Sequence, residues 1–399
     1  MKKTISILSL VGIIALLTLG SCKKKIEDTN DPPATPATSA TILNAKFTTT
    51  APTLDGLIDA SWANCDVLSN TATVPTSASL AADFAFFQGE KYEFTMRSQY
   101  DVNNLYILLE YKDPTKSLDR MSWYFNGTTK LWKQQSKKPL NATDKFYEDK
   151  FAFLWPTATA GADWNANTCY NTCHAVDKTK GFDTENKHYT EVGETIDMWH
   201  YKGVRTGPSN QTDDQKMISV VDLNNPTATE KADGGRGSDA NTGGGVFDNK
   251  QTLNNGAANV SVPLWIIPNN TNYFWINVSD TANGTAKKIT GVDENGILTY
   301  NGGTIDPATG GYETGTGTKR FPSIMNKGTV LGSRGDIITF GNHTGTGWVF
   351  EIKRPLTTTD LANDVQWDIA KDYMFGFAIF ENSAVAHGIK ANLKLTFAK

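Results

Sequence analysis

The chain has 399 residues, 39% of them hydrophobic and 11% aromatic, which is enough to bury one large or two ordinary hydrophobic cores. The net charge of −4 is spread along the chain, and no basic stripe of the kind that binds nucleic acid is present. With 34 Gly and 15 Pro, and many Thr and Asn, the composition favours a β-rich, loop-rich protein over a helical one.

The first 21 residues have the pattern of an export signal. Two lysines precede an apolar run, Ile5–Leu19, which is too short for a transmembrane helix. The run ends in Gly20-Ser21-Cys22, which resembles a bacterial lipobox and predicts cleavage before Cys22 and lipid attachment to its sulfur. An ordinary secretory signal in which Cys22 has no role is the alternative. We expect a lipoprotein of the cell envelope that faces the periplasm, with the outer membrane as its expected location.

Residues 22–41 are predicted to form a flexible tether. They are rich in Pro, Thr, Ala and Ser, and such a composition cannot bury a core. The remaining residues, 42–399, are interpreted as one domain.

Strand patterns begin after this tether. The turn Leu54-Asp55-Gly56, followed by Trp62, resembles the opening of extracellular β-sandwich binding modules. Two apolar runs, Phe94–Tyr100 and Leu105–Tyr111, are separated by a polar Asp-Val-Asn-Asn turn and predict a hairpin. A further predicted strand, Phe146–Pro156, leads directly into a loop that contains two cysteines.

The C-terminal part regains a strong strand pattern after a weaker region. Residues 226–320 are poor in charge and rich in Gly, Asn and Thr, and we interpret them as a long insertion into the same domain. Gly345–Arg354 alternates clearly, and the apolar run Tyr373–Phe380 and a last strand to Phe397 follow. We therefore predict an all-β fold, a β-sandwich of the immunoglobulin-like or carbohydrate-binding-module-like kind, with long loop excursions and few short helices.

The central motif is Cys169-Tyr170-Asn171-Thr172-Cys173-His174, or C-x-x-x-C-H. Two thiols followed by an imidazole can attach a c-type haem, because each thiol adds to a vinyl group and the histidine then ligates the iron. The usual spacing has two residues between the cysteines, and here there are three. The alternative is a small structural disulfide in an exported protein, with His174 incidental. Cys65 is left over and is expected to be a buried thiol.

Several stretches together resemble the ethylbenzene-dehydrogenase-like haem-binding family, which includes the gamma subunits of dimethyl-sulfoxide-reductase-type molybdenum enzymes and related periplasmic cytochromes. They occur in the family's order over residues 50–399. The stretches are Tyr111–Arg120 with Trp123, Tyr147–Pro156, the CYNTCH motif, Met198–Arg205, Arg334–Asp336, Trp348–Leu356 and Asp364–Phe380.

The resemblance implies a β-sandwich that holds one haem near one end of its sheets and transfers electrons outside the cytoplasm. The gamma subunits hold a non-covalent haem b between a Met and a Lys, whereas many relatives carry C-x-x-x-C-H after the strand that matches Phe151–Pro156. This chain resembles the second group. The resemblance therefore implies haem c, with Cys169 and Cys173 as thioether donors and His174 as the proximal ligand; haem b is the alternative.

A low-spin electron-transfer haem needs a second strong-field axial ligand. The candidates are His387 and Lys390, since the family's second ligand comes from this end of the fold, and His200 in the matched Met-Trp-His-Tyr-Lys run. Met198 and Met374 are weaker candidates, because a methionine in an apolar run more often serves packing.

Three residues of the matched Met198–Arg205 stretch are further candidates for contact with the haem. Arg205 and Lys202 could pair with propionates, since a guanidinium matches a carboxylate; surface salt bridges are the alternative. Trp199 could pack against the macrocycle or belong to the core. Asp336, Asp360 and Asp364 look like turn and cap residues, and no EF-hand-like pattern is present.

These features predict a monohaem c-type cytochrome that transfers electrons, either alone or as the haem subunit of a molybdenum oxidoreductase. The expected partners are a redox protein or a catalytic subunit, and a membrane through the lipid anchor. We expect no catalysis by this chain, because a six-coordinate iron has no open position. One alternative is a haem-free β-sandwich lipoprotein that binds a carbohydrate or a partner protein; another is a five-coordinate haem enzyme or sensor.

Overall fold

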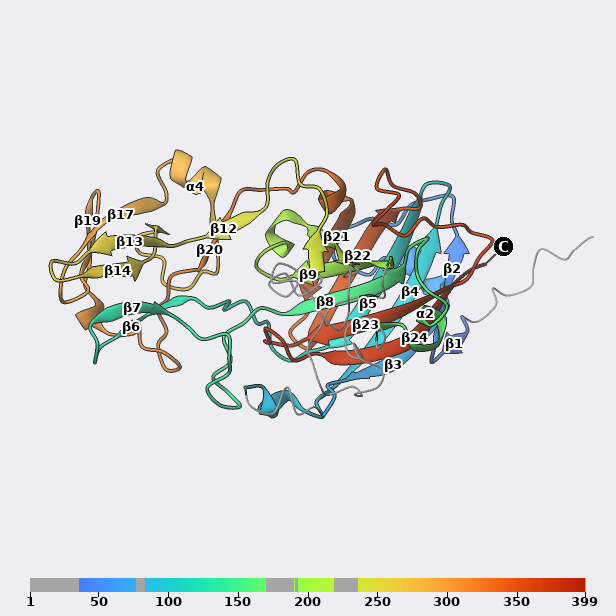
Figure 1. Cartoon of the computed structure of the whole chain (residues 1–399), viewed down its shortest axis with the longest axis horizontal. Coiled ribbons are helices and arrows are strands. Elements are labelled where there is room, and N and C mark those ends of the chain that lie inside the picture. Colours follow the sequence, from blue (N-terminus) through green and yellow to red (C-terminus); the bar gives the residue numbers. More distant parts are fainter. Residues whose placement is uncertain (1–35, 77–82, 170–189, 191–192, 219–235, 399) are drawn as a thin grey trace, which may run out of the picture. The chain divides into compact units, whose positions relative to one another are not determined.

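The computed structural model describes residues 36–76, 83–169, 190, 193–218 and 236–398 (Figure 1). Ten strands form the main sheet: β2 (Ile42–Phe47), β4 (Lys91–Tyr100), β5 (Asn104–Lys112), β8 (Lys150–Pro156), β9 (Thr195–Lys202), β10 (Gln211–Ile218), β21 (Ile337–His343), β22 (Gly347–Pro355), β23 (Tyr373–Phe380) and β24 (Gly388–Phe397). Three further strands join it: β1 (Thr38–Ser39), β3 (Val67–Thr73) and β11 (Arg236–Ser238).

The main sheet closes on itself. Its strands are hydrogen-bonded in the order β24-β2-β4-β5-β22-β21-β10-β9-β8-β23, and β23 pairs with β24 to complete the ring. The nearly all-β architecture with few short helices is confirmed, but the prediction of a sandwich was wrong, since the ten strands form a barrel. Alternating patterns identify the two faces of a strand but not its neighbours. The parallel pairing of β2 with β24, which links Ile42 to Lys394, is therefore invisible in the sequence.

Side chains that alternate along each strand fill the barrel interior. On β8, Phe151, Phe153 and Trp155 are almost fully buried in the interior cluster, and Ala152 and Leu154 point outward. The predicted alternation of β22 is confirmed, because its three inward residues join the same cluster. Burying a large apolar side chain contributes roughly 1.5–3 kcal/mol, so this aromatic interior is the main source of the barrel's stability.

The predicted turn near the start of the domain packs on the outside of β5 and β22. Glu351 of β22 accepts hydrogen bonds from the backbone N–H groups of Asp55 and Gly56, both at 2.9 Å, and from the indole of Trp62 at 3.0 Å. Gly56 has φ +79°, a conformation that glycine adopts without strain. Trp62 is buried as predicted, and Cys65 is a buried cysteine with no disulfide partner within the described ranges.

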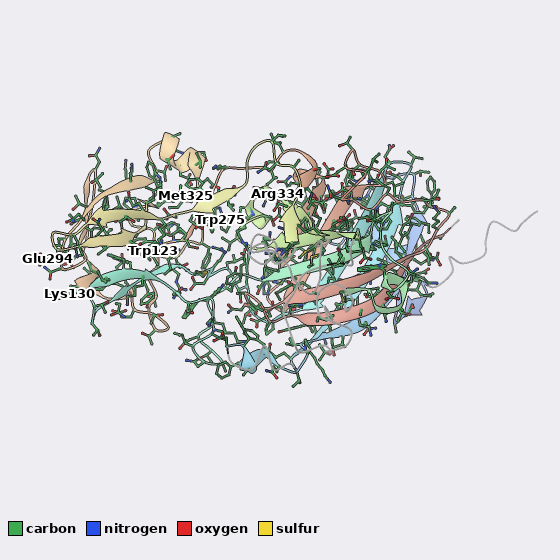
Figure 2. The ribbon with its side chains drawn as sticks, in the orientation of Figure 1. Trp123, Lys130, Trp275, Glu294, Met325 and Arg334 are labelled. Carbon is green, nitrogen blue, oxygen red and sulfur yellow. The ribbon has the colours of Figure 1, made fainter. Side chains whose placement is uncertain are left out.

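Residues of the insertion and of a hairpin between β5 and β8 form a second apolar cluster. The hairpin is β6 (Trp123–Asn126) and β7 (Leu131–Gln134), and the other strands are β12 (Val246–Asp248), β13 (Gln251–Asn254), β14 (Asn259–Val262), β15 (Trp265–Ile266), β16 (Ile276–Asn277), β17 (Lys287–Val292), β18 (Leu298–Tyr300), β19 (Gly303–Ile305) and β20 (Ile324–Asn326). The indole of Trp123 donates to the carbonyl of Asn249, and that of Trp132 donates to Gly296. The insertion therefore contains short strands and a packed apolar cluster where the structure describes it (Figure 2).

Helices are few and short in the described part of the chain. They are η1 (Ala60–Asn64), η2 (Ala85–Phe87), α2 (Trp164–Asn167), η4 (Gly207–Ser209), α4 (Val278–Ala282), η5 (Pro307–Thr309) and η6 (Ser333–Gly335). Among the residues described, no helix has the length and apolar character needed to cross a membrane.

A pair of buried carboxyl groups near the end of β5 predicts a pH-dependent stability. Asp149 accepts three N–H donors, yet burial and the negative charge of Asp113 raise its pKa well above the ordinary value. Burial and the negative charge of Glu381 raise the pKa of Asp113 to about 6; His343, which contacts the Asp113 backbone, opposes this. The pKa of Asp113 is higher in the folded state than in the unfolded state, so the folded state is favoured while this carboxyl is protonated. This contribution to the free energy of unfolding is complete below about pH 4 and is lost as the pH rises through about 6. We expect Asp113→Asn to flatten this decline in the free energy of unfolding, measured by urea unfolding from pH 4 to 7. An unchanged slope would contradict the assignment.

Candidate functional site

The outer face of β8, β9, β23 and β24 is apolar although it lies outside the barrel core. The register places Ala378, Ala152 and His200 in one row across β23, β8 and β9. Gly376 and the two alanines carry little or no side chain, so other groups can pack closely on the sheet here. We call this surface the outer apolar face; its buried residues are Ala152, Leu154, Trp164, Cys169, Ile196, Met198, Met217, Phe380 and Ile389.

Cys169, the first cysteine of the motif, is positioned against this face. It follows helix α2, where the indole of Trp164 donates a 2.9 Å hydrogen bond to a backbone carbonyl of β23. The hydroxyl of Thr168, which directly precedes Cys169, accepts a hydrogen bond from the backbone N–H of Asn392 on β24 at 3.0 Å. These bonds hold the Cys169 side chain over Gly376. Three of the predicted residues lie outside the part of the chain that the structure describes: Cys22, Cys173 and His174.

His200 is the buried imidazole of the outer apolar face. Its side chain is 3% exposed, and its Nδ1 lies 3.3 Å from Oε1 of Gln215 on β10. Since an amide oxygen can only accept, Nδ1 carries the proton and Nε2 carries the lone pair. Nε2 has no hydrogen-bond partner among the residues described. Burial, assisted by the charges of Lys202 and Lys150, lowers the pKa of His200 well below its ordinary value, so the ring is neutral at pH 7.

His387 lies beside the same face but on the other side of an aromatic ring. Its imidazole stacks on Phe380 at 4.4 Å between centroids, and Phe380 in turn stacks on His200 at 5.6 Å. Nδ1 of His387 donates to the carbonyl of Val385 at 2.6 Å, which gives the same Nδ1-protonated tautomer as in His200. The two histidines therefore flank Phe380, and they do not face one another.

Lys202 and Arg205 already have carboxylate partners. The Lys202 ammonium forms a buried ion pair with Asp213, which also accepts from Arg334. Arg205 pairs through Nε with the fully buried Glu148 at 2.6 Å. Burial lowers the pKa of Lys202 to about 8 although Asp213 opposes this shift. Both basic groups are thus structural members of ion pairs in the described protein.

Two other candidates point away from the outer apolar face. Trp199 lies between Met198 and His200 on β9, so its side chain points into the barrel, where it belongs to the interior cluster. Lys390 alternates on β24 with Ile389 and Ala391, which both pack on the outer face, and its side chain therefore takes the opposite direction. The structure brings Cys169, Met198 and Met374 together in one apolar cluster, and the register places His200 on the same face of the sheet. Trp199 and Lys390 do not share this face.

Several residues of this surface were missed in the sequence. Gln215, Gly376 and Phe380 all orient or contact the candidate side chains, yet each lies in an ordinary strand pattern. Lys150 was also missed: it is buried, with its ammonium 4.1 Å from the Phe380 ring centroid and donating to Ala384. The period-two alternation of β9 could have assigned Trp199 and His200 to opposite faces of the strand. The residues that neighbour them on adjacent strands cannot be identified from the local sequence.

The contact between Gly376 and Cys169 gives a direct prediction. A β-carbon at position 376 would lie 2.7 Å from Cβ and 2.8 Å from Sγ of Cys169, so Gly376→Ala must displace the motif. We expect a loss of roughly 1–3 kcal/mol in the free energy of unfolding, measured with urea, as for other overpacked sites. The control is Gly127→Ala, whose β-carbon would meet nothing within 4 Å. Equal effects of the two substitutions would show that Cys169 does not pack on Gly376.

The described chain is therefore a closed all-β protein with a buried, neutral imidazole on an outer apolar face. Its sequence matches the family model described as ethylbenzene dehydrogenase over residues 69–391. The chain belongs to this family, and the resemblance inferred from its motifs is confirmed.

No curated protein matches the chain. Among solved structures, it is similar to a carbohydrate binding module family 9 (CBM9) from Caldicellulosiruptor kristjanssonii in complex with glucose, at 9% identity and a TM-score of 0.28, covering 90% of this chain and 94% of that one. The same module in complex with cellotriose gives 9% identity and a TM-score of 0.29, with coverages of 89% and 93%. These likenesses are too weak to bear on the function.

Proposed function

We propose that this chain is an electron-transfer protein that binds one haem against the outer apolar face. Cys169 and Cys173 form the thioether bonds, and His174 and His200 are the axial ligands of the iron. The observation that carries the proposal is the buried Nε2 of His200, which has a lone pair and no hydrogen-bond partner among the residues described. A buried polar atom without a partner is costly, and an iron ligand would remove that cost.

The residues present fit such a group. A metal-bound histidine usually donates its other N–H to an oxygen acceptor, as His200 does to Gln215. Its low pKa keeps the imidazole neutral, which is the form that binds a metal. Cys169 stands on the same surface, over Gly376, and the apolar residues around it can exclude water from a macrocycle.

His200 is preferred over the other candidates for the second axial position. Both imidazoles stack on Phe380, and His200 is the more deeply buried of the two. Lys390 points to the opposite face of β24. Lys202 and Arg205 would have to leave Asp213 and Glu148 to reach propionates, so they are not part of this proposal.

The haem would supply reversible one-electron transfer, and the chain would supply its position and surroundings. Two protein ligands leave no open site on the iron, so the chain itself is proposed to be non-catalytic. The apolar face keeps water away, which favours electron transfer with little rearrangement. We further propose, from the predicted lipobox, that Cys22 anchors the protein to a membrane facing the periplasm. There it would serve a redox partner or the catalytic subunit of a molybdenum oxidoreductase.

The proposal is tested by producing the protein in a host with cytochrome c assembly and recording its absorption spectrum before and after acid-acetone extraction. We expect a Soret band and a haem that stays with the protein. We expect Cys169→Ala to weaken this attachment, and the double variant Cys169→Ala/Cys173→Ala to release the haem on extraction. Cys65→Ala, which removes a buried thiol elsewhere, is the control and should leave attachment unchanged. An extractable haem would point to haem b with a disulfide between the motif cysteines. Absence of a Soret band would overturn the proposal in favour of a haem-free binding module.

A further inference from the structure

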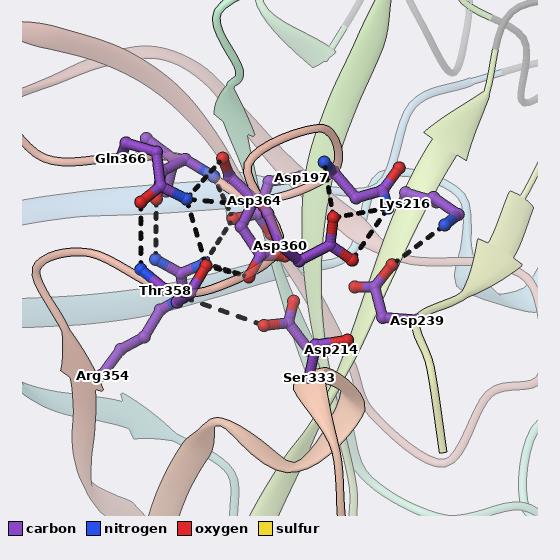
Figure 3. A network of polar contacts seen from close by, with 12 residues as sticks. Asp197, Asp214, Lys216, Asp239, Ser333, Arg354, Thr358, Asp360, Asp364 and Gln366 are labelled. Atoms are coloured by element: carbon purple, nitrogen blue, oxygen red, sulfur yellow. Dashed lines mark hydrogen bonds and ion pairs between the residues drawn. The ribbon is translucent and has the colours of Figure 1, made fainter. Parts of the chain in front are cut away.

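A dense group of carboxylates lies beside the barrel end of β9 and β10, away from the outer apolar face. Figure 3 shows the network, and its acidic members are Asp197 of β9, Asp214 of β10, Asp239 after β11, and Asp360 and Asp364 between β22 and β23. They form two groups that share Asp364, and within each group carboxylate oxygens lie within 4.8 Å of one another. Among the described residues, these five carboxylates contact only two basic side chains, an excess of three negative charges if all are ionised.

The first group already contains a cation. The guanidinium of Arg354 lies 3.2 Å from Asp197, 3.2 Å from Asp364 and 3.8 Å from Asp214. It also donates to the backbone carbonyl of Val365 at 2.9 Å, which fixes its orientation. Arg354 thus compensates the charge of Asp364 at Oδ2, and Oδ1 of Asp364 remains available to the second group.

The second group has much weaker compensation. Asp239, Asp360 and Asp364 are close enough to share one ion, and the ion pair described for Asp239 is with Lys216 at 3.3 Å. Asp360 and Asp364 are oriented by neighbouring donors, Asn363 at 2.8 Å and Thr358 at 2.6 Å respectively. These bonds leave Oδ1 of Asp364 without a partner. Asp360 is only half-buried, so an ion could reach the group from solvent.

Buried carboxylate oxygens that accept no hydrogen bond point independently to a missing cation. Asp214 is 0% exposed and has Arg354 at 3.8 Å, but neither of its oxygens accepts a hydrogen bond from the described protein. The oxygens of Asp239 accept none either, although Lys216 lies 3.3 Å from Oδ1. An oxygen of Asp214 lies within 4.8 Å of ligand oxygens of Asp197 and Asp364. The backbone of Asp239 donates to the carbonyl of Asp214, so the two segments are held side by side. Buried charged groups are normally paired or coordinate a metal.

The electrostatics agree with this geometry. Burial raises the pKa of Asp197 to about 7 and that of Asp239 to about 6, with the charge of Asp364 adding to both shifts. Burial and Asp197 raise the pKa of Asp214 well above its ordinary value. The negative charges therefore repel one another, and a bound divalent cation would relieve that repulsion.

We propose that Asp239, Asp360 and Asp364, with Asp214 beside them, bind one Ca²⁺ ion. Carboxylate oxygens are the ligands of hard cations, and a group of several carboxylates suits Ca²⁺, which takes 6–8 oxygen ligands, better than Mg²⁺, which usually keeps several waters. The ion would tie the segment after β11 to the loop between β22 and β23. The site shares no ligand with the proposed haem site, and its occupancy does not depend on haem.

The test is a calorimetric titration of the chelator-treated full-length protein with CaCl₂ at neutral pH, with MgCl₂ titrated separately. We expect one saturable Ca²⁺ site and weaker Mg²⁺ binding. Asp239→Asn should weaken the Ca²⁺ association constant about tenfold or more, because it removes one ligand charge. The matched control is Asp248→Asn, an exposed aspartate of β12, which should bind Ca²⁺ as the wild type does.

Two outcomes would overturn the proposal. One is the absence of saturable binding below about 10 mM Ca²⁺, well above the weakest sites of extracellular modules. The other is equal Ca²⁺ affinity in Asp239→Asn, Asp360→Asn and the wild type, which would place any bound ion elsewhere. Asp360→Asn changes a half-buried side chain, so it keeps the test decisive if Asp239→Asn fails to fold.

Discussion

Replacing Arg354 by methionine is expected to lower the free energy of unfolding by roughly 3–5 kcal/mol. The guanidinium is fully buried, and it contacts the equally buried carboxylates of Asp197, Asp214 and Asp364. Removing it leaves these carboxylates without a compensating charge in a place that water does not reach. Methionine matches the unbranched part of arginine as far as Nε but lacks the guanidinium carbon and its two terminal nitrogens, so the loss combines the missing charge and hydrogen bonds with a small cavity.

Urea unfolding in a buffer with a chelator measures this effect, since no added cation can then replace the guanidinium. Arg97→Met is the matched control, because Arg97 pairs with Glu110 at a similar distance, 2.8 Å, but on a partly exposed surface. Such a pair contributes about 0–1 kcal/mol. Arg354→Lys should lie between the two, because it keeps the charge but loses the planar fork. Equal losses for Arg354→Met and Arg97→Met would contradict the structural role of the buried cluster.

Replacing His200 by alanine is expected to convert a low-spin, six-coordinate haem into a high-spin form. His200 is proposed as the second axial ligand, and its Nε2 has no other partner in the described chain. The haem should stay attached through the cysteines, so the change is one of ligation, not of content. Absorption and electron paramagnetic resonance spectra of the ferric protein measure it, and added imidazole should restore the low-spin signal.

His387→Ala is the control for this substitution. It removes the imidazole on the other side of Phe380, and the proposal expects the low-spin spectrum to remain. A low-spin spectrum in His200→Ala combined with a high-spin spectrum in His387→Ala would transfer the ligand assignment to His387. Low-spin spectra in both variants would exclude both histidines.

Much of the strand content could be predicted from alternation, and much of its arrangement could not. The hairpin of β4 and β5 and the inward face of β22 follow from local patterns and are confirmed. β10 shows the limit: it reads Gln-Thr-Asp-Asp-Gln-Lys, a polar run, yet it is a buried strand of the barrel. Its charges are matched by Lys202, Arg334 and Arg354, which lie elsewhere in the chain, so only the folded protein explains it.

Of the candidate site, too, only the features that are local in the sequence could be predicted. The C-x-x-x-C-H motif and the family stretches could be recognised because they are contiguous, and His200 was included through one of them. Its distinction from Trp199 and Lys390 depends on which face of a strand points outward. Asp364 shows what a local pattern leaves out: it ends a turn, as predicted, but it also pairs with Arg354 inside the buried cluster. A single aspartate in a loop gives no sign of partners more than a hundred residues away, such as Asp197.

The most direct test of the proposed haem site is anomalous diffraction at the iron absorption edge from crystals of the matured protein. The account predicts a single iron peak over the outer apolar face, within bonding distance of Nε2 of His200 and of the His174 imidazole. An iron peak that His200 does not reach, or crystals of fully matured protein with no iron peak, would contradict the account.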